Sequence, residues 1–427
     1  MHKKIFLGMA VGTVAGIVVQ YSGISPEAIQ LMVCLVKPVG NIFLRMIFMA
    51  VIPLILSALA LGIAEIGDIK RIGKVGLRTL IYTVVVSVIA VLIGVGMVAV
   101  FKPGKNLSEE KRHLLIEKFS GNSEALEKVP TTKNTRGILD TLVQLVPKNP
   151  LEDMTRAFDP TYTGGGILAV IFFSFMIGIA LLLSDPEKTR TLRKFLEGLY
   201  EIVMKIIAIG MKLAPFGVAS LLFCLTATMG FSIIVILSKY VLVVLFALAL
   251  HQFGTYSLLL KFLGKMSPVY FFKNIAEVML VAFSTSSSNV TLPTTLRTSI
   301  EKLKLPADIS QFVLTVGSTA NQNGTALYEG VTVLFLAQCF GVDLTFSQQL
   351  FVVFIAVLAG IGTAGVPGGS LPTVAMILTS IGLPAESIGI IYGVDRILDM
   401  SRTVLNVTGD MTAVVYVSRY EKCLKGQ

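Results

Sequence analysis

The chain has 427 residues, of which 54% are hydrophobic and only 15% charged, and its formal net charge is +10. This composition excludes an ordinary soluble globular protein, whose surface needs a larger share of charged residues. The basic residues occur in short clusters between apolar runs rather than in one patch, which argues against a nucleic-acid-binding protein. The composition therefore predicts an integral membrane protein.

The first half of the chain contains apolar runs of about 20 residues, the length of a helix that crosses a hydrocarbon core about 30 Å thick. The N-terminal run follows a basic start but has no small-residue cleavage site, so it is predicted to be the first span rather than a signal peptide. The predicted runs are 5–22, 32–66, 79–101, 164–184, 199–229 and 232–263.

Residues 102–163 interrupt this series because they are polar and mixed in charge. They are predicted to form a long external loop, which is exempt from the charge rule for short loops. The amphipathic stretch GILDTLVQLVPKNPLEDM within it is expected to lie at the membrane interface or to lead into the fourth span.

The distribution of Lys and Arg predicts the orientation. If the runs alternate, the basic clusters all fall on one side, and the opposite connections near 229–232, 341–348 and 382–388 contain no Lys or Arg. Basic loops remain in the cytoplasm, so both termini are expected inside, in a prokaryotic inner membrane. The clusters lie at 3–4, 70–78, 188–194, 261–273 and 419–425.

The second half contains apolar segments that are interrupted by polar or flexible residues. Two interruptions, FSTSSSNVTLP (283–293) and GIGTAGVPGGSLP (360–372), are rich in Ser, Gly and Pro, and each is followed by another interrupted span. Paired broken segments in corresponding positions indicate a secondary transporter with a site at the membrane midplane. The predicted fold is an all-α polytopic membrane protein with eight transmembrane helices and two oppositely oriented re-entrant helical hairpins.

The last span has one polar face. Asp395, Asp399, Arg402, Asn406 and Asp410 fall within roughly 80° of one another on a helix. A charge at the centre of a bilayer costs about 3 kcal/mol or more unless it is paired or solvated. The stripe is therefore either a structural network of ion pairs or a binding site.

The residue types on this face suit an acidic amino acid. Arg402 can bind a carboxylate in bidentate fashion, and Asp399, one helical turn away, can bind an ammonium group. The serines at 286–288 and the Gly-rich stretch 365–369 offer hydroxyls and free backbone groups at broken helix ends. Asp410 has no Lys or Arg within the preceding turn and is a candidate cation ligand.

These motifs resemble the dicarboxylate/amino acid:cation symporters, the family of excitatory amino acid transporters and archaeal aspartate transporters. The resemblance covers nearly the whole chain and implies a homotrimer of independent elevator-type transporters, not an enzyme. The matching stretches are FLRMIFMAVIP, KLAPFGV, STSSSNVTLP, NQNGTALYEG, GTAGVPGG and DRILDMSRTVLNVTGD.

The same resemblance implies a division into two domains. A scaffold that holds the trimer would comprise 1–78 and 164–231. A transport domain that moves would comprise the third span, 79–101, and residues 232–427, which contain the sixth span, both hairpins and the last two spans. The external loop 102–163 lies between these parts in sequence.

The resemblance also implies the positions of the ligands. The expected substrate-binding residues are Ser286, Ser287, Ser288, Thr325, Val366, Gly369, Asp399, Arg402, Thr403 and Asn406. One sodium ion would be bound by Gly317, Asn321, Asn406 and Asp410, and a second by Thr319, Gly360, Ile361 and Thr363.

The sequence departs from the family pattern at the broken span, where the usual NMDGT is NQNGT. The acidic ligand of a third sodium ion is replaced by Asn323, and a hydroxyl ligand in the third span is replaced by Val86, with Ser87 beside it. A neutral amide does not offset the cost of desolvating a cation. We therefore expect the third site to be lost and two sodium ions to remain, while Gln322 could face either the second sodium ion or the substrate.

Three further residues bear on coupling and charge. Glu329 is a candidate proton carrier and His251 a candidate partner for it, although a lone buried histidine is more often a core residue. The arginine that archaeal relatives have in the first hairpin is Ser286 here, and its alternative position is Met400. Arg396 either supplies this charge or pairs with Asp395.

The sequence predicts a symporter of aspartate or glutamate coupled to sodium, with proton coupling as a further candidate. The alternatives are a proton-coupled dicarboxylate symporter and a channel-like anion pathway. A channel would need a continuous polar lining, whereas the polar residues here concentrate at discontinuous segments of one half of the chain. An intramembrane aspartyl protease is disfavoured because Arg402 lies among the carboxylates and keeps them ionised.

Overall fold

All the elements of the computed structural model that are described are helical. Within these residues, five helices are long and apolar enough to cross a membrane. The prediction of an all-α membrane protein is confirmed. The residues described are 2–61, 63–64, 74–105, 107, 109–120, 146–157, 162, 166–362 and 369–424.

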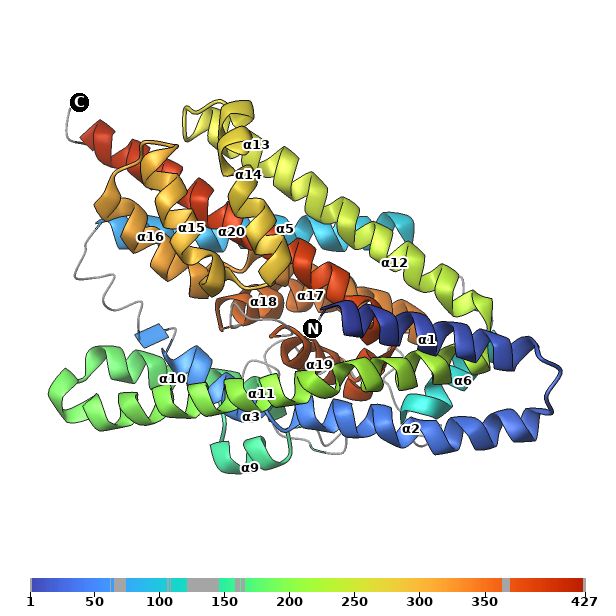
Figure 1. Cartoon of the computed structure of the whole chain (residues 1–427). Coiled ribbons are helices and arrows are strands. Elements are labelled where there is room, and N and C mark those ends of the chain that lie inside the picture. The colour runs from blue at the N-terminus through green and yellow to red at the C-terminus, as the bar shows by residue number, and fades with distance from the viewer. Residues whose placement is uncertain are drawn as a thin grey trace.

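The helices form two layers (Figure 1). The first, the α11 layer, contains the long helix α11, with α1 and α2 packed along it. Its elements are α1 (His2–Tyr21), α2 (Pro26–Phe48), α3 (Val51–Leu54), η1 (Ile55–Leu59), α9 (Pro150–Thr155), α10 (Gly166–Leu183) and α11 (Pro186–Met229).

Glycines at every fourth position bring α1 into backbone contact with α11. A Cβ on Gly8 would lie 2.2 Å from the carbonyl oxygen of Pro215, and one on Gly12 would lie 2.2 Å from that of Ala219. Small residues at this spacing allow two helices in a membrane to approach more closely than larger side chains permit. Helix α1 is therefore fixed against the C-terminal part of α11, from Pro215 onward.

Helix α11 begins at Pro186 rather than at residue 199, so the predicted start of this span was wrong. The Asp185 carboxylate caps the helix and accepts from the Glu187 N–H at 3.0 Å. Charged pairs one turn apart, such as Arg193 with Glu197, continue the helix through the basic cluster. The cluster lies on the helix and not in a connecting loop.

The second layer, the α20 layer, contains the segments that were predicted to be interrupted. Helix α20 runs through it and contacts α5, α12 and α14 to α17. The elements of this layer are α5 (Lys74–Phe101), α12 (Phe231–Ala249), η2 (Leu250–Thr255), α13 (Tyr256–Phe262), α14 (Pro268–Thr285), α15 (Ser288–Glu301), α16 (Ala307–Ala320), α17 (Asn323–Phe340), α18 (Phe346–Gly362), α19 (Leu371–Ser380), η3 (Ala385–Ile390) and α20 (Tyr392–Leu424).

The predicted breaks have clear local causes. Ser286 has a left-handed φ of 51°, which ends α14 and turns the chain into α15 as a helical hairpin. Helix α16 ends at Ala320 and α17 starts at Asn323, so Asn321 and Gln322 form the break inside the seventh span. Helices α18 and α19 are the two arms of the second hairpin.

Two parts of the external loop are helical in the described residues: α6 (Glu109–Ser120) and α9. Helix α6 contacts α17 and η3, and α9 contacts α10. The first nine residues of the amphipathic stretch, 137–145, lie outside the described residues. The remainder leads through α9 toward α10, as one of the two alternatives expected.

Candidate functional site

The predicted polar face of α20 is buried inside the protein. Asp395, Asp399, Arg402, Asn406 and Asp410 are all at most 4% exposed. Helix α20 places them in one row, and the broken ends of α16 and α17 and both hairpins supply the residues opposite them. The stripe therefore faces protein rather than lipid.

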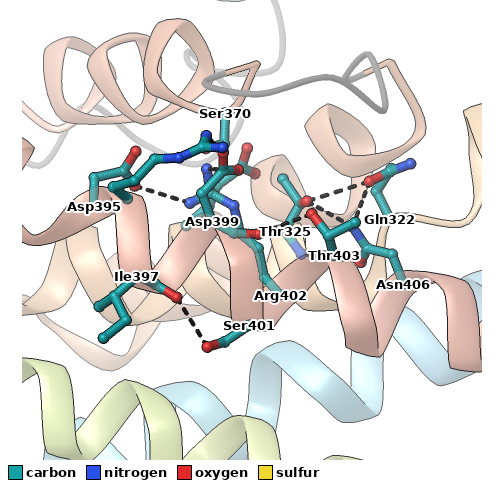
Figure 2. Close-up of polar contacts among 12 residues, drawn as sticks. Gln322, Thr325, Ser370, Asp395, Ile397, Asp399, Ser401, Arg402, Thr403 and Asn406 are labelled. Atoms are coloured by element: carbon teal, nitrogen blue, oxygen red, sulfur yellow. Dashed lines mark hydrogen bonds and ion pairs between the residues drawn. The ribbon is translucent and has the colours of Figure 1, made fainter. Parts of the chain in front are cut away.

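Arg402 lies at the centre of this row (Figure 2). Its Nη1 donates to Asp395 Oδ1 at 3.1 Å, and its Nη2 donates to Asp399 Oδ1 at 2.7 Å. Its Cζ lies 4.2 Å from the centroid of the Tyr328 ring, a cation–π contact from α17. Two carboxylates and one aromatic ring thus hold the guanidinium in place.

Arg396 belongs to the same cluster. Its Nη1 donates to Asp399 Oδ2 at 2.8 Å, and its side chain is 7% exposed. Arg396 therefore brings a second positive charge to the site, next to Asp399. Two arginines and two aspartates make the cluster neutral overall.

A second cluster surrounds Asn406, one turn beyond Arg402 (Figure 2). Asn406 Nδ2 donates to Gln322 Oε1 at 2.5 Å and to Thr325 Oγ1 at 3.1 Å, while Asn406 Oδ1 accepts from the Gly324 N–H at 2.7 Å. Thr403 Oγ1 donates to the Asp399 carbonyl at 2.8 Å. The break in the seventh span is thus bonded directly to α20, and Gln322 faces the predicted substrate residues.

The two hairpins bring hydroxyls that have no partner among the described residues. Ser286 and Ser288 at the tip of the first hairpin and Ser370 in the second are buried, and none of their Oγ atoms makes a hydrogen bond. Ser287 instead caps α15 and accepts from the Val290 N–H at 3.3 Å. Buried hydroxyls normally have a hydrogen-bond partner, so three unpaired ones indicate places where water or a ligand binds.

The residues of the first predicted sodium site lie together. Asn321 Nδ2 donates to Asp410 Oδ1 at 2.7 Å, and a Cβ on Gly317 would lie 2.5 Å from that same oxygen. Asn321 Oδ1 is buried without a hydrogen-bond partner. A buried carboxylate, an unpaired carbonyl oxygen and the C-terminal end of α16 are the oxygen donors that a hard cation prefers.

The second predicted sodium site is described only in part. Thr319 and Ile361 lie in the last turns of α16 and α18, and a Cβ on Gly360 would lie 3.5 Å from the Gln322 carbonyl oxygen. Thr363, together with the predicted substrate residue Val366, lies outside the described residues. Gly369 is buried directly before α19.

Asn323 makes hydrogen bonds through both ends of its amide. Its Oδ1 accepts from the Ser87 hydroxyl at 2.5 Å, and its Nδ2 donates to the Tyr256 hydroxyl at 3.2 Å, which itself donates to the Leu405 carbonyl at 3.2 Å. Val86 is buried and supplies only methyl groups. The amide hydrogens of Asn323 therefore point toward the Tyr256 hydroxyl.

Glu329 is fully buried in α17, and one of its carboxyl oxygens is bonded to the Thr373 hydroxyl of α19. The other carboxyl oxygen has no partner among the described residues. His251 packs edge-on against the Tyr256 ring, with centroids 4.7 Å apart, and neither of its ring nitrogens has a hydrogen-bond partner. The structure therefore does not link His251 to Glu329 by a hydrogen bond.

Sequence reasoning missed several residues of this site. Ser370, Thr373 and Tyr328 approach it only because the second hairpin folds against α17 and α17 folds against α20. Asp395 was recognised as part of the polar face but not as a partner of Arg402. Its spacing of seven residues from Arg402, two helical turns, was the available signal.

The structure combines a broken helix, two helical hairpins and a buried charged site. This combination is typical of a secondary membrane transporter rather than an enzyme. The comparisons with known proteins agree: the chain belongs to the sodium:dicarboxylate symporter family, whose model matches residues 1–420.

Individual relatives are similar over almost the whole chain. A proton/sodium-glutamate symport protein of Bacillus subtilis is 33% identical over 99% of this chain and 92% of its own length. A proton/glutamate-aspartate symporter of Escherichia coli is 32% identical over 98% of this chain and 92% of its own length. Excitatory amino acid transporter 1 of Ambystoma tigrinum is 32% identical over 90% of this chain and 77% of its own length.

Proposed function

We propose that the protein is a symporter of acidic amino acids, aspartate or glutamate, driven by sodium. The observation that carries the proposal is the buried pair of Arg402 and Asp399, 2.7 Å apart. A ligand with a side-chain carboxylate and an ammonium group presents the same two charges. Such a ligand can therefore replace the ion pair between Arg402 and Asp399 and leave both residues paired. An unpaired charge buried at either residue would cost several kcal/mol.

The remaining ligand groups have partners nearby. The α-carboxylate would bind at the hairpin tips, where Ser286 and Ser288 offer hydroxyls. The backbone at Gly369 and Val366 would add N–H groups. Thr325, Thr403 and Asn406 would complete the pocket, and Gln322 holds Asn406 and Thr325 in position. The names of the glutamate and aspartate symporters among the relatives support this substrate class.

Dicarboxylates that lack an amino group are the second candidate. The position of Arg396 favours this candidate. Because Arg396 forms an ion pair with Asp399, the Asp399 carboxylate would keep a partner when the substrate has no ammonium group. Competition assays separate the two classes. We expect aspartate and glutamate to inhibit uptake of labelled aspartate at far lower concentrations than succinate or malate does.

We propose that two sodium ions accompany the substrate. The unpaired Asn321 Oδ1 beside Asp410 supports the first ion, and the ends of α16 and α18 around Thr319, Gly360 and Ile361 support the second, which Thr363 would complete. The hydrogen bonds of Asn323 to Ser87 and Tyr256 support the loss of a third site.

Glu329 is our candidate for proton coupling. The Thr373 hydroxyl lies within hydrogen-bond distance of both Glu329 and the Ser370 carbonyl, the latter at 2.7 Å. A hydroxyl has one hydrogen, so it can serve both oxygens only if one of them brings its own proton. A protonated Glu329 would donate to Thr373 while Thr373 donates to the carbonyl.

The test is uptake into proteoliposomes with each gradient imposed alone. A sodium gradient is expected to drive accumulation of acidic amino acids, and a proton gradient to increase it. The reversal potential of labelled aspartate flux is expected to give two sodium ions per substrate. A value of three would contradict the loss of the third site, and uptake without any sodium dependence would contradict the sodium coupling itself.

We further propose that the α11 layer is the scaffold of a homotrimer in an inner membrane, that both termini are cytoplasmic, and that the α20 layer moves as the transport domain. Support comes from the two-layer arrangement, in which every proposed ligand residue that the structure describes lies in the α20 layer (Figure 1). The basic clusters and the family resemblance support the orientation and the trimer.

A further inference from the structure

Arg396 is a charged residue of the site to which the proposed amino acid scheme gives no role. Its Nη1 donates to Asp399 Oδ2 at 2.8 Å. The other oxygen of the same carboxylate, Oδ1, accepts from Arg402 at 2.7 Å. Guanidinium groups therefore bind both oxygens of Asp399.

This arrangement conflicts with the binding of an amino acid. The substrate ammonium needs an oxygen of Asp399, and it would then lie beside the positive charge of Arg396. Two cations at one carboxylate repel each other strongly in a site that excludes water. Arg396 and the ammonium are therefore competitors for Asp399.

Arg396 borders a small crevice between the two layers. This crevice is the direction in which the guanidinium would turn when an ammonium group takes its place at Asp399. The crevice is lined by Ile5 of α1, Met211 of α11, and Tyr392, Asp395, Arg396 and Asp399 of α20.

The charges explain what Arg396 contributes when the substrate is absent. With Arg396 in place, Asp395, Asp399, Arg396 and Arg402 sum to zero, and each carboxylate has an ion-pair partner. If Arg396 were removed, two buried carboxylates would share the single charge of Arg402. An uncompensated charge in the interior is strongly unfavourable, above all while the pocket is sealed from water.

We propose that Arg396 is a positioning residue that occupies Asp399 in place of the substrate ammonium whenever the pocket is empty. By doing so it keeps the four-residue cluster neutral and allows the carrier to return across the membrane without substrate. The proposal rests on the proposed function, because it takes Asp399 as the ammonium site of an amino acid carrier.

A carrier that cannot return empty still exchanges substrate for substrate, since both directions of exchange occur with the pocket filled. The proposal therefore predicts that Arg396 affects net uptake but not exchange. An ion pair that only stabilises the fold would affect both processes to the same degree.

The experiment compares Arg396→Met with the wild type in proteoliposomes. Net uptake of labelled aspartate is measured in empty vesicles under a sodium gradient, and exchange is measured in vesicles loaded with unlabelled aspartate. We expect the variant to lose at least about tenfold in the initial rate of net uptake, equivalent to about 1.4 kcal/mol in the rate-limiting step, and to keep exchange within about twofold. Its KM for aspartate in exchange should fall, because the competing guanidinium is gone.

Two control variants complete the design. Arg396→Lys keeps the positive charge and should restore most of the net uptake. Arg419→Met removes an exposed arginine from the same helix and should match the wild type in both assays.

Equal losses of net uptake and exchange, or no loss in either, would overturn the role of Arg396. Wild-type vesicles that transport neither aspartate nor glutamate in either assay would instead contradict the proposed function, and the role of Arg396 with it.

Discussion

At the scale of single residues, Arg402 has the largest expected effect. Arg402→Met leaves Asp395 without its ion pair and removes the partner of the substrate carboxylate. Because hydrogen bonds to charged groups contribute about 1.5–3 kcal/mol each, we expect kcat/KM for aspartate to fall by roughly 100-fold or more. Labelled uptake measures this, with size-exclusion chromatography to verify folding. A folded Arg402→Met protein with an unchanged kcat/KM for aspartate would contradict the substrate assignment.

Asn323 tests the proposed loss of a third sodium site. In Asn323→Asp, a buried carboxylate replaces the amide and loses the hydrogen bond to Tyr256. Without sodium, this should cost about 1–3 kcal/mol of stability, and added sodium should recover part of it by binding the new carboxylate. Melting temperatures in sodium and in choline measure the effect. The control is Asn274→Asp in α14, which should show the same change of melting temperature with sodium as the wild type. If Asn323→Asp also responds to sodium only as the wild type does, position 323 is not a vacated cation site.

Glu329 tests proton coupling. In Glu329→Gln the amide group donates to Thr373 as a protonated carboxyl would, so the variant imitates the permanently protonated form. Sodium-driven uptake should persist, whereas the increase produced by an imposed proton gradient should disappear. Glu386→Gln, at an exposed position of η3, is the matched control and should retain that increase. A proton response that survives in Glu329→Gln would exclude this residue as the carrier.

At the scale of helices, the contact between α1 and α11 depends on the absence of side chains at Gly8 and Gly12. Gly12→Ala places a methyl group 2.2 Å from the Ala219 carbonyl oxygen, so the helices must separate. We expect a loss of about 1–3 kcal/mol, since overpacking in a closely packed interface costs this much. Gly198→Ala in α11 has nothing within 4 Å of the new methyl group and should leave the melting temperature unchanged or slightly raised.

Some features of the helices can be predicted from sequence patterns, and others cannot. The polar face of α20 follows from helical periodicity alone, and the hairpins follow from Ser-, Gly- and Pro-rich interruptions in apolar segments. The start of α11 could not be predicted in this way, because hydropathy marks the apolar stretch and not the capped, charged turns before it. Contacts such as Thr373 with Glu329 join separate elements, and only the packing of the second hairpin on α17 brings them together.

At the scale of the whole molecule, the proposed motion requires the two layers to slide past each other. Tyr392 of α20 donates to Met211 Sδ of α11 at 3.5 Å, so cysteines at these two positions can be joined across the boundary by a short bifunctional reagent that forms a disulfide with each thiol. In a background without the four native cysteines, we expect cross-linking to stop both net uptake and exchange, and reduction to restore them. Full transport by the cross-linked protein would rule out sliding at this boundary.

The length of α11 has a further consequence for the protein in its bilayer. Its 44 residues extend about 66 Å at 1.5 Å per residue, more than twice the thickness of the hydrocarbon core. A helix this long adapts to a change in membrane thickness by tilting. Because the glycines of α1 fix that helix backbone against backbone to the part of α11 from Pro215 onward, α1 must tilt together with that part. Lipid chain length therefore sets the inclination of the surface along which the α20 layer rests.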